Sequence, residues 1–172
     1  MAIENREDVM ALPQGDLGLL GSEVARRLLA SRELARVAYV AADGTPRVFP
    51  MLFHWTGAEI VLSTFGGAKV GALRARPDVA ITIDVASTPP EALLIRGRAR
   101  VTDVEGVVPE YALALRRYGG QEQAAAQLAA LDHPGVTMVR IAVRPAWAGV
   151  LDFQTRLPGG ISMRDFERRG RR

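Results

Sequence analysis

The sequence predicts a mainly β (α+β) protein: a split β-barrel of six to seven largely antiparallel strands with short peripheral helices. Segments rich in β-branched and aromatic residues recur along the chain, separated by turn pairs such as Asp43-Gly44 and Thr56-Gly57. Only short helices are inserted between them, an order that does not make a doubly wound sheet. A small barrel, closed or split, removes the sheet edges that such strands would otherwise expose.

The first part of the chain predicts one helix and three strands. Ser22 precedes the segment EVARRLLA, residues 23–30, and its hydroxyl is a good cap for a helix that ends near Ser31. We expect the next three segments to form a meander through the two turn pairs: RVAYVAA (36–42), RVFPMLFHW (47–55) and AEIVLST (58–64).

The middle of the chain predicts a short helix over residues 68–76, ended by Pro77, and then the strand DVAITID over residues 78–84. The long segment ALLIRGRARVTDV, residues 92–104, alternates between two kinds of side chain. One face should be buried (Leu93, Ile95, Gly97, Ala99, Val101) and the other wet (Leu94, Arg96, Arg98, Arg100).

The last part predicts two helices and two strands. Pro109 suits the first turn of a helix, which Gly119-Gly120 should stop, and a second helix follows over residues 121–131. The segments 136–143 and 146–153 are the final expected strands. Because side chains fill a barrel of this size, we expect any binding site on its outer wall or at a subunit interface.

Length and composition indicate one globular domain over residues 1–172, since 48% of the residues are hydrophobic and 24% charged. No apolar run approaches the roughly 20 residues of a membrane helix. The first residues carry charges of both signs without an apolar core, unlike a secretory signal. We therefore expect a cytoplasmic protein with no membrane contact.

Several kinds of site are excluded or disfavoured by composition. With no cysteine, the chain has no disulfide, thiolate metal site or cysteine nucleophile. His54 and His133 stand far apart, so no metal site is predicted. The net charge of +3 comes from residues 164–172, within a basic tail over 154–172. A solvated terminus is favoured there over a nucleic-acid or partner-binding arm.

Lys69 is the only lysine among 22 basic residues, and it falls in the first turn of the helix expected over 68–76. A cation there opposes the positive end of the helix dipole, so a compensating group is expected. Free N–H groups at a helix start, Gly66-Gly67 and the hydroxyls of Ser63 and Thr64 together suit phosphate. The alternative is an ordinary surface lysine.

The run from Asp43 to Asp84, DGTPRVFPMLFHWTGAEIVLSTFGGAKVGALRARPDVAITID, resembles the pyridoxamine 5′-phosphate oxidase-like, FMN-binding split β-barrel proteins. The shared order is strand, turn, strand with an R-x-x-P centre, strand ending in hydroxyls, loop, lysine, short helix and strand. With LLIRGRARVTDV downstream, the resemblance covers residues 22–151, the expected FMN-binding core.

The resemblance implies roles for particular residues. In that family an arginine and a lysine hold the FMN phosphate, and they fall on Arg47 and Lys69. The strand-end hydroxyls fall on Ser63 and Thr64, and the strand backbone beside the flavin ring falls on the segment Val48, Phe49 and Pro50. Without the resemblance, Arg47 is equally well interpreted as a strand-end arginine near solvent.

The resemblance also implies a homodimer with the cofactor at the interface, and an aromatic residue of the partner that closes the flavin pocket; Trp147 is the candidate. A core position is the alternative for Trp147. Leu52 stands where true pyridoxamine phosphate oxidases have a substrate-binding lysine, so oxidation of that vitamin is not expected. No catalytic side chain is predicted, because a flavin ring itself carries the hydride.

Three functions are compatible with the sequence and with this resemblance. The first is an FMN-dependent oxidoreductase that passes hydride between a nicotinamide donor and a small-molecule acceptor. The second is a deazaflavin-dependent reductase, for which Arg96, Arg98 and Arg100 would supply a basic groove; a solvated outer face is their simpler interpretation. The third is a flavin-binding carrier or sensor module without turnover.

Overall fold

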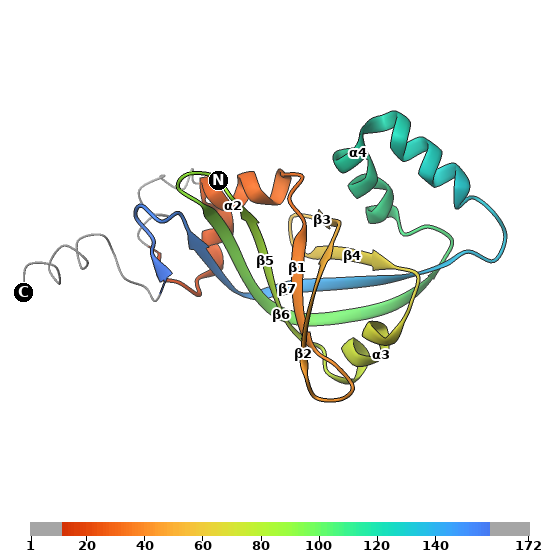
Figure 1. The fold of residues 1–172 in the computed structure, drawn as a ribbon, viewed down its shortest axis with the longest axis horizontal. Helices are drawn as coiled ribbons and strands as arrows, with labels where there is room; N and C mark the ends of the chain where they lie inside the picture. The colour runs from red at the N-terminus through yellow and green to blue at the C-terminus, as the bar shows by residue number, and fades with distance from the viewer. Residues whose placement is uncertain (1–11, 159–172) are drawn as a thin grey trace, which may run out of the picture.

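Seven antiparallel strands form a single sheet in residues 12–158, the part of the chain that this computed structural model describes. Their order across the sheet is β2-β1-β5-β6-β7-β4-β3 (Figure 1). The sheet curls into a split barrel, which confirms the predicted fold class. Its strands are β1 (Ala35–Val40), β2 (Pro46–Met51), β3 (Phe53–Trp55), β4 (Ile60–Thr64), β5 (Asp78–Val85), β6 (Glu91–Glu105) and β7 (Thr137–Leu151).

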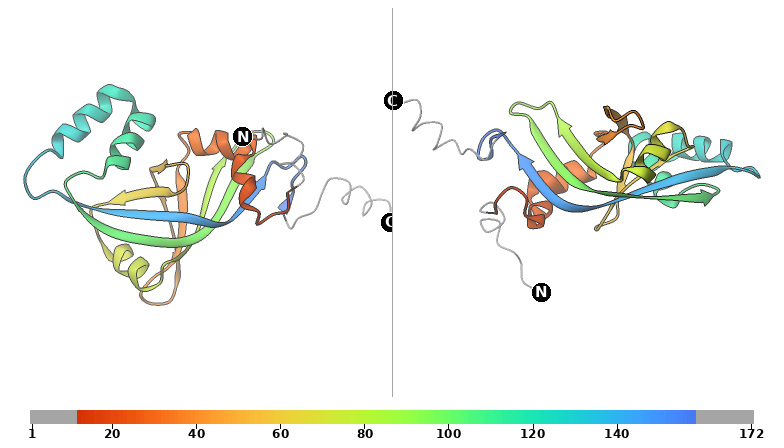
Figure 2. Two further views of the ribbon diagram at one scale, coloured as in Figure 1. Left: turned by 180° about the vertical axis from the view of Figure 1, so that it is seen from behind. Right: turned by 90° about the horizontal axis from the view of Figure 1, so that it is seen from below.

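The helices lie around the sheet and are η1 (Leu17–Gly21), α2 (Glu23–Ala30), α3 (Ala68–Ala75) and α4 (Pro109–Ala130). Helix α2 starts as expected, with the Ser22 hydroxyl accepting from the Ala25 N–H at 3.2 Å. Helix α3 packs against β1 and β6, whereas α4 packs against β3 and β4, so the two helices lie on different sides of the molecule (Figure 1, Figure 2). None of these helices is both long and apolar enough to cross a membrane.

The expected three-stranded meander is wrong. Strand β1 pairs with β2, and β3 pairs with β4, but β2 and β3 lie at opposite edges of the sheet although only Leu52 separates them in sequence. The segment 47–55 therefore supplies two short strands, one to each hairpin. Both turn pairs form hairpins as predicted, but hairpin signals do not specify whether neighbouring hairpins share a strand.

The two final strands predicted over 136–143 and 146–153 are one continuous strand, β7. Pro145 interrupts the hydrogen-bonding pattern without ending the strand, because it lies opposite Gly97 at an irregularity in the β6–β7 register. A Cβ atom on Gly97 would lie 2.5 Å from the Arg144 carbonyl oxygen, so the two backbones come closer here than a larger residue would permit.

The predicted alternation along β6 is confirmed for most of its residues; Leu94, expected to be wet, and Val101, expected to be buried, are both half-buried. Leu93, Ile95 and Ala99 are buried in the barrel interior, and Arg96, Arg98 and Arg100 are exposed. The predicted break in the later helix is also confirmed, since Gly120 has φ 81° and ψ 174° within α4. The arginine-rich segment 164–172 lies outside the described residues.

Candidate functional site

The segment between β4 and α3 is an open glycine loop. Ser63 and Thr64 end β4 half-buried, and the Thr64 hydroxyl lies 3.4 Å from the Gly66 carbonyl oxygen. Gly66 and Gly67 have φ values of 113° and 100°, which residues with a side chain rarely adopt. No heavy atom lies within 4 Å of a Cβ added to either glycine, so the loop faces open space.

Helix α3 begins without a side-chain cap. Its N-cap is Gly67, which has no side chain to accept from the N–H groups of the first turn. The helix has no acidic residue in that turn. The Val70 N–H donates to the Gly67 carbonyl oxygen at 3.0 Å, and no side chain caps the N–H groups before it, so these groups and the helix dipole give this end a positive potential.

Lys69 adds a positive charge to that end of α3. Its side chain is half-buried, and Nζ lies 5.5 Å from the centre of the Phe49 ring on β2. Within residues 12–158 no carboxylate forms an ion pair with Lys69. The compensating anion that the sequence led us to expect is therefore not an acidic side chain of the described chain.

Arg47 lies on the same side of β2 as Phe49, because residues two apart in a strand share a face. The Phe49 ring packs edge-on against Tyr39, at 5.3 Å between centroids, and Tyr39 is directly opposite Arg47 in the β1–β2 register. The structure thus groups Arg47, Phe49 and Lys69 on one side of β2.

The Arg47 guanidinium is engaged by an acid that the sequence analysis did not single out. Asp43, in the preceding turn, forms an ion pair with it at 3.0 Å. Hydrogen bonds from the Thr45 hydroxyl and backbone hold the pKa of Asp43 below its usual value. The spacing of four residues across the Asp-Gly turn was the available signal for this pair.

Strand β2 is an edge of the sheet and pairs only with β1 in the described structure. Its outward backbone edge leaves N–H and C=O groups for a ligand or a second chain. Val48 and Pro50 point to the opposite side from Arg47 and Phe49, and the Val48 side chain is 65% exposed. On its outward edge this segment has no strand partner in the described structure.

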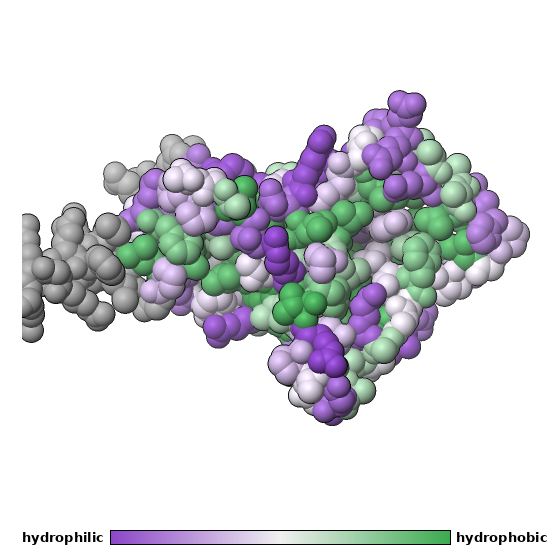
Figure 3. Space-filling model, viewed as in Figure 1, coloured by the Kyte–Doolittle hydropathy of each residue, from purple (hydrophilic) through white to green (hydrophobic). Residues whose placement is uncertain are grey.

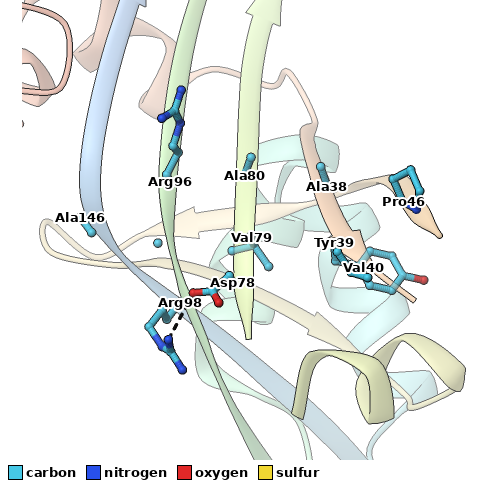
Figure 4. Close-up of a pocket in the computed structure, with 11 residues that line it drawn as sticks. Ala38, Tyr39, Val40, Pro46, Asp78, Val79, Ala80, Arg96, Arg98 and Ala146 are labelled. Carbon is cyan, nitrogen blue, oxygen red and sulfur yellow. Dashed lines mark hydrogen bonds and ion pairs between the residues drawn. The ribbon is translucent and has the colours of Figure 1, made fainter. Parts of the chain in front are cut away.

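A shallow hollow of about 580 Å³ lies over the outer side of β1, β5 and β6. Figure 4 shows the small side chains Ala38 and Ala80 near its middle and the Arg98–Asp78 ion pair, 3.3 Å, at one end. On the face of the molecule shown in Figure 3, which is viewed as in Figure 1, apolar and polar residues are interspersed. The hollow is lined by Ala38, Tyr39, Val40, Pro46, Asp78, Val79, Ala80, Arg96, Gly97, Arg98 and Ala146.

Trp147 is placed away from the cluster of Arg47, Phe49 and Lys69. It is half-buried on β7, with the Arg96 guanidinium 4.2 Å from its ring centre. Gly15 also lies against the indole, since an added Cβ there would be 2.7 Å from the Trp147 Nε1 atom. Trp147 therefore contacts Arg96, which lines the hollow, rather than the loop before α3.

Neither histidine belongs to the cluster of Arg47, Phe49 and Lys69 or lines the hollow. His54 lies on β3, where burial and the nearby Arg117 lower its pKa. His133 lies in the turn after α4, with Nδ1 3.2 Å from the Pro134 carbonyl oxygen. In residues 12–158 no group of three or more potential metal-ligating side chains comes together.

A second charged cluster, also missed from sequence, joins α4 to the sheet. Arg140 on β7 donates to Glu110 Oε1 at 2.7 and 3.0 Å and lies 3.7 Å from Glu59. Its hydrogen bond lowers the pKa of Glu110. Arg140 is directly opposite Ser63 across β4 and β7, but its charge is neutralised by these carboxylates. This cluster is therefore a poor anion site.

The donor set beside β2 fits a phosphate group. It combines an ammonium without a carboxylate partner in the described chain, an uncapped helix start, open glycines and an arginine on the same side. The nearby strand edge and aromatic ring suit a flat ligand attached to that phosphate.

Comparison with known proteins identifies proteins that are similar to this chain. A family model described as pyridoxamine 5′-phosphate oxidase matches residues 22–147. A solved structure named F420 Reductase is 25% identical, with a TM-score of 0.54, and the match covers 71% of this chain and 93% of that one. A search of curated proteins gave no match.

Two further solved structures share the fold at lower identity. One is a putative pyridoxamine 5′-phosphate oxidase from Listeria innocua, 18% identical with a TM-score of 0.54, covering 73% of this chain and 93% of that one. The other is General Stress Protein 26 from Bacillus anthracis, 13% identical with a TM-score of 0.56, covering 76% and 92%.

Proposed function

The chain belongs to the pyridoxamine 5′-phosphate oxidase family, and from this premise we propose that it is an FMN-dependent oxidoreductase. The reaction would transfer hydride between a nicotinamide donor and a small acceptor. The observation that carries the proposal is Lys69, a half-buried cation at an uncapped helix start with no carboxylate partner in residues 12–158. Phosphate would supply the missing counter-charge.

Each part of the site has a physical role in this proposal. Lys69 and the first-turn N–H groups of α3 would bind the phosphate, with Arg47 as a second cation. The hydroxyls of Ser63 and Thr64 would donate hydrogen bonds near the same end. The outward edge of β2, from Val48 to Pro50, would orient the ring through backbone hydrogen bonds.

When bound, the flavin supplies the hydride chemistry, and the protein orients it and excludes water. This division of labour accounts for a site without a histidine or a cysteine. The Phe49 ring, which contacts both Tyr39 and Lys69, gives the ligand an apolar neighbour beside the cations.

We further propose a homodimer with the cofactor at the interface. The hollow over β1, β5 and β6 carries small apolar side chains (Figure 4). Val48 is opposite Ala38 in the β1–β2 register, so its exposed side chain lies on the same outer side of the sheet. A second copy would bury these groups, and its Trp147 would complete the pocket around the cofactor. Sedimentation equilibrium of the purified protein tests this, and a monomeric mass at micromolar concentration contradicts it.

A deazaflavin-dependent reductase is the second candidate. It is favoured by the 25% identity to the structure named F420 Reductase. The exposed Arg96, Arg98 and Arg100 on β6 would bind an acidic tail, although Arg98 and Arg100 already pair with carboxylates at 3.3 and 3.1 Å. FMN requires no such groove and remains the first candidate.

The test is titration of the protein with FMN and with a deazaflavin, for wild type and Lys69→Ala. We expect Lys69→Ala to weaken FMN binding by about 1.5 to 3 kcal/mol, because a charge-assisted hydrogen bond is lost. Arg26→Ala removes a positive charge from the exposed side of α2 and is the matched control. Equal FMN binding by wild type and Lys69→Ala would contradict the phosphate role.

Turnover is tested on the loaded protein. Reduction of the bound flavin by NADPH and reoxidation by a quinone support an oxidoreductase, whereas a bound flavin that resists both identifies a carrier or sensor module. Tight binding of deazaflavin with no FMN binding assigns the second candidate.

A further inference from the structure

The turn before β2 holds the Arg47 side chain in a defined position. Arg47 Nη2 lies 3.0 Å from Asp43 Oδ2, and Nη1 donates to the Thr45 hydroxyl. The other carboxylate oxygen, Asp43 Oδ1, accepts from the Thr45 N–H at 2.9 Å and from the Thr45 hydroxyl at 2.6 Å. Thr45 thus fixes the Asp43 carboxylate with its second oxygen aimed at Arg47.

The turn itself is fixed against α3. Arg76, the C-cap of α3, donates to the Ala41 carbonyl oxygen at 2.9 Å. A backbone hydrogen bond from Ala41 to Thr45, 2.9 Å, closes the turn around Gly44. The turn that carries Asp43 is therefore joined by a hydrogen bond to the same helix that carries Lys69.

Lys69 and Arg47, the two cations of the proposed phosphate site, differ in whether a carboxylate already pairs with them. Lys69 has no carboxylate partner in the described chain, whereas Arg47 already has one. A small anion that takes Arg47 from Asp43 exchanges one exposed ion pair for another and gains little. A phosphate attached to a larger ligand has a further driving force, because ring burial beside Phe49 and the edge of β2 contributes to binding.

We propose that Asp43 competes with the ligand's phosphate for Arg47 and so lowers the affinity of the site for any phosphate group. The cost is the same for free phosphate and for a phosphate ester, so free phosphate is held weakly, whereas a ligand whose ring also binds along β2 has a second source of affinity. This inference rests on the proposed function and deepens it, because it gives Asp43 a role in setting how tightly the site binds phosphate.

The test compares wild type with Asp43→Asn, which keeps an oxygen able to accept from Thr45 and removes the charge. Inorganic phosphate is titrated into the flavin-free protein and followed by phosphorus NMR; FMN and riboflavin are titrated by flavin fluorescence. We expect Asp43→Asn to tighten phosphate and FMN binding by about two- to five-fold and to leave riboflavin unchanged.

Two further variants separate competition for Arg47 from other effects. Glu91→Gln removes one carboxylate from an exposed pair with Arg27 on α2 and should change none of the three affinities. In an Arg47→Met background, Asp43→Asn should no longer change phosphate or FMN binding. An unchanged phosphate affinity in Asp43→Asn, or an equal gain for riboflavin, overturns the proposal.

The phosphate titration needs no flavin, so the two proposals fail separately. If wild type binds no flavin, the proposed function is wrong, and the phosphate titration of Asp43→Asn still decides whether Asp43 competes for Arg47.

Discussion

The two edge strands of the sheet, β3 and β2, differ in whether the described chain covers them. At the edge formed by β3, Arg117 of α4 donates to the Phe53 carbonyl oxygen and, at 3.1 Å, to the Leu29 carbonyl oxygen. Its guanidinium stacks on the rings of Phe53 and Tyr118, at 4.5 and 4.9 Å. The Tyr118 hydroxyl donates to the Glu33 carbonyl oxygen at 2.6 Å. This edge is covered by the chain's own helix.

At the edge formed by β2, the described chain provides no such cover. Two of its six residues, Pro46 and Pro50, lack an N–H, which suits an edge strand. Beside it stand Lys69, without a carboxylate partner in residues 12–158, and Arg47, held by Asp43. The difference indicates that the β3 edge is covered by the chain itself, whereas the β2 edge remains available for the binding proposed above.

The largest expected effect tests the covered edge. Arg117→Met should lower the free energy of unfolding by about 2 to 4 kcal/mol, because the Phe53 and Leu29 carbonyl oxygens lose a charged donor. Urea unfolding followed by circular dichroism measures it. Arg116→Met, at the exposed neighbouring position, should change stability by less than about 0.5 kcal/mol. Equal stability of the two variants would show that the α4 contact does not support this edge.

A smaller effect is expected where Glu110 and Arg140 fasten α4 to the sheet. The pKa of Glu110 is lower in the folded chain, so its ionised form stabilises the fold above its unfolded value of 4.5. That stabilisation is lost as the pH falls through the lower, folded pKa. Glu110→Gln should therefore cost about 1 kcal/mol at pH 7 and progressively less below pH 4.5.

Thermal unfolding of wild type and Glu110→Gln between pH 3 and pH 7 measures this difference. A gap between the two proteins that stays constant over the whole range would mean that ionisation of Glu110 does not contribute. Glu59→Gln is a useful companion, since Glu59 shares Arg140 but lies farther from it, at 3.7 Å against 2.7 Å.

The local elements were predictable because their signals lie within a few residues. The Ser22 cap, the two turn pairs, the break at Gly120 and the alternation along β6 all follow from neighbouring residue types. The separation of β2 from β3 at Leu52 was not predictable, because it depends on which strands each hairpin meets across the sheet. Pairing between distant segments leaves no local mark in one sequence.

The same limit applies to the site. The position of Lys69 in the first turn of α3 was expected from sequence, and the structure adds its contact with Phe49. The Asp43–Arg47 pair spans a turn and was within reach of sequence reasoning, through the spacing alone. The pairing of Arg140 with Glu110 joins residues 30 positions apart, and only the fold shows it.

The smallest expected effect comes from making the same valine-to-threonine substitution near each edge of the sheet. Val48 on β2 is 65% exposed, whereas Val61 on β4, beside the β3 edge, is 2% exposed. In the monomer, Val48→Thr should change the free energy of unfolding by less than about 0.5 kcal/mol, because its hydroxyl remains in water when no second copy covers it. Val61→Thr should cost about 1 to 3 kcal/mol, since it buries a hydroxyl under α4. FMN binding by Val48→Thr should be unchanged, because the proposed contacts of that segment are made by its backbone. A loss of stability in Val48→Thr as large as in Val61→Thr, measured at a concentration where the protein is monomeric, would contradict the exposure of Val48 in the single chain.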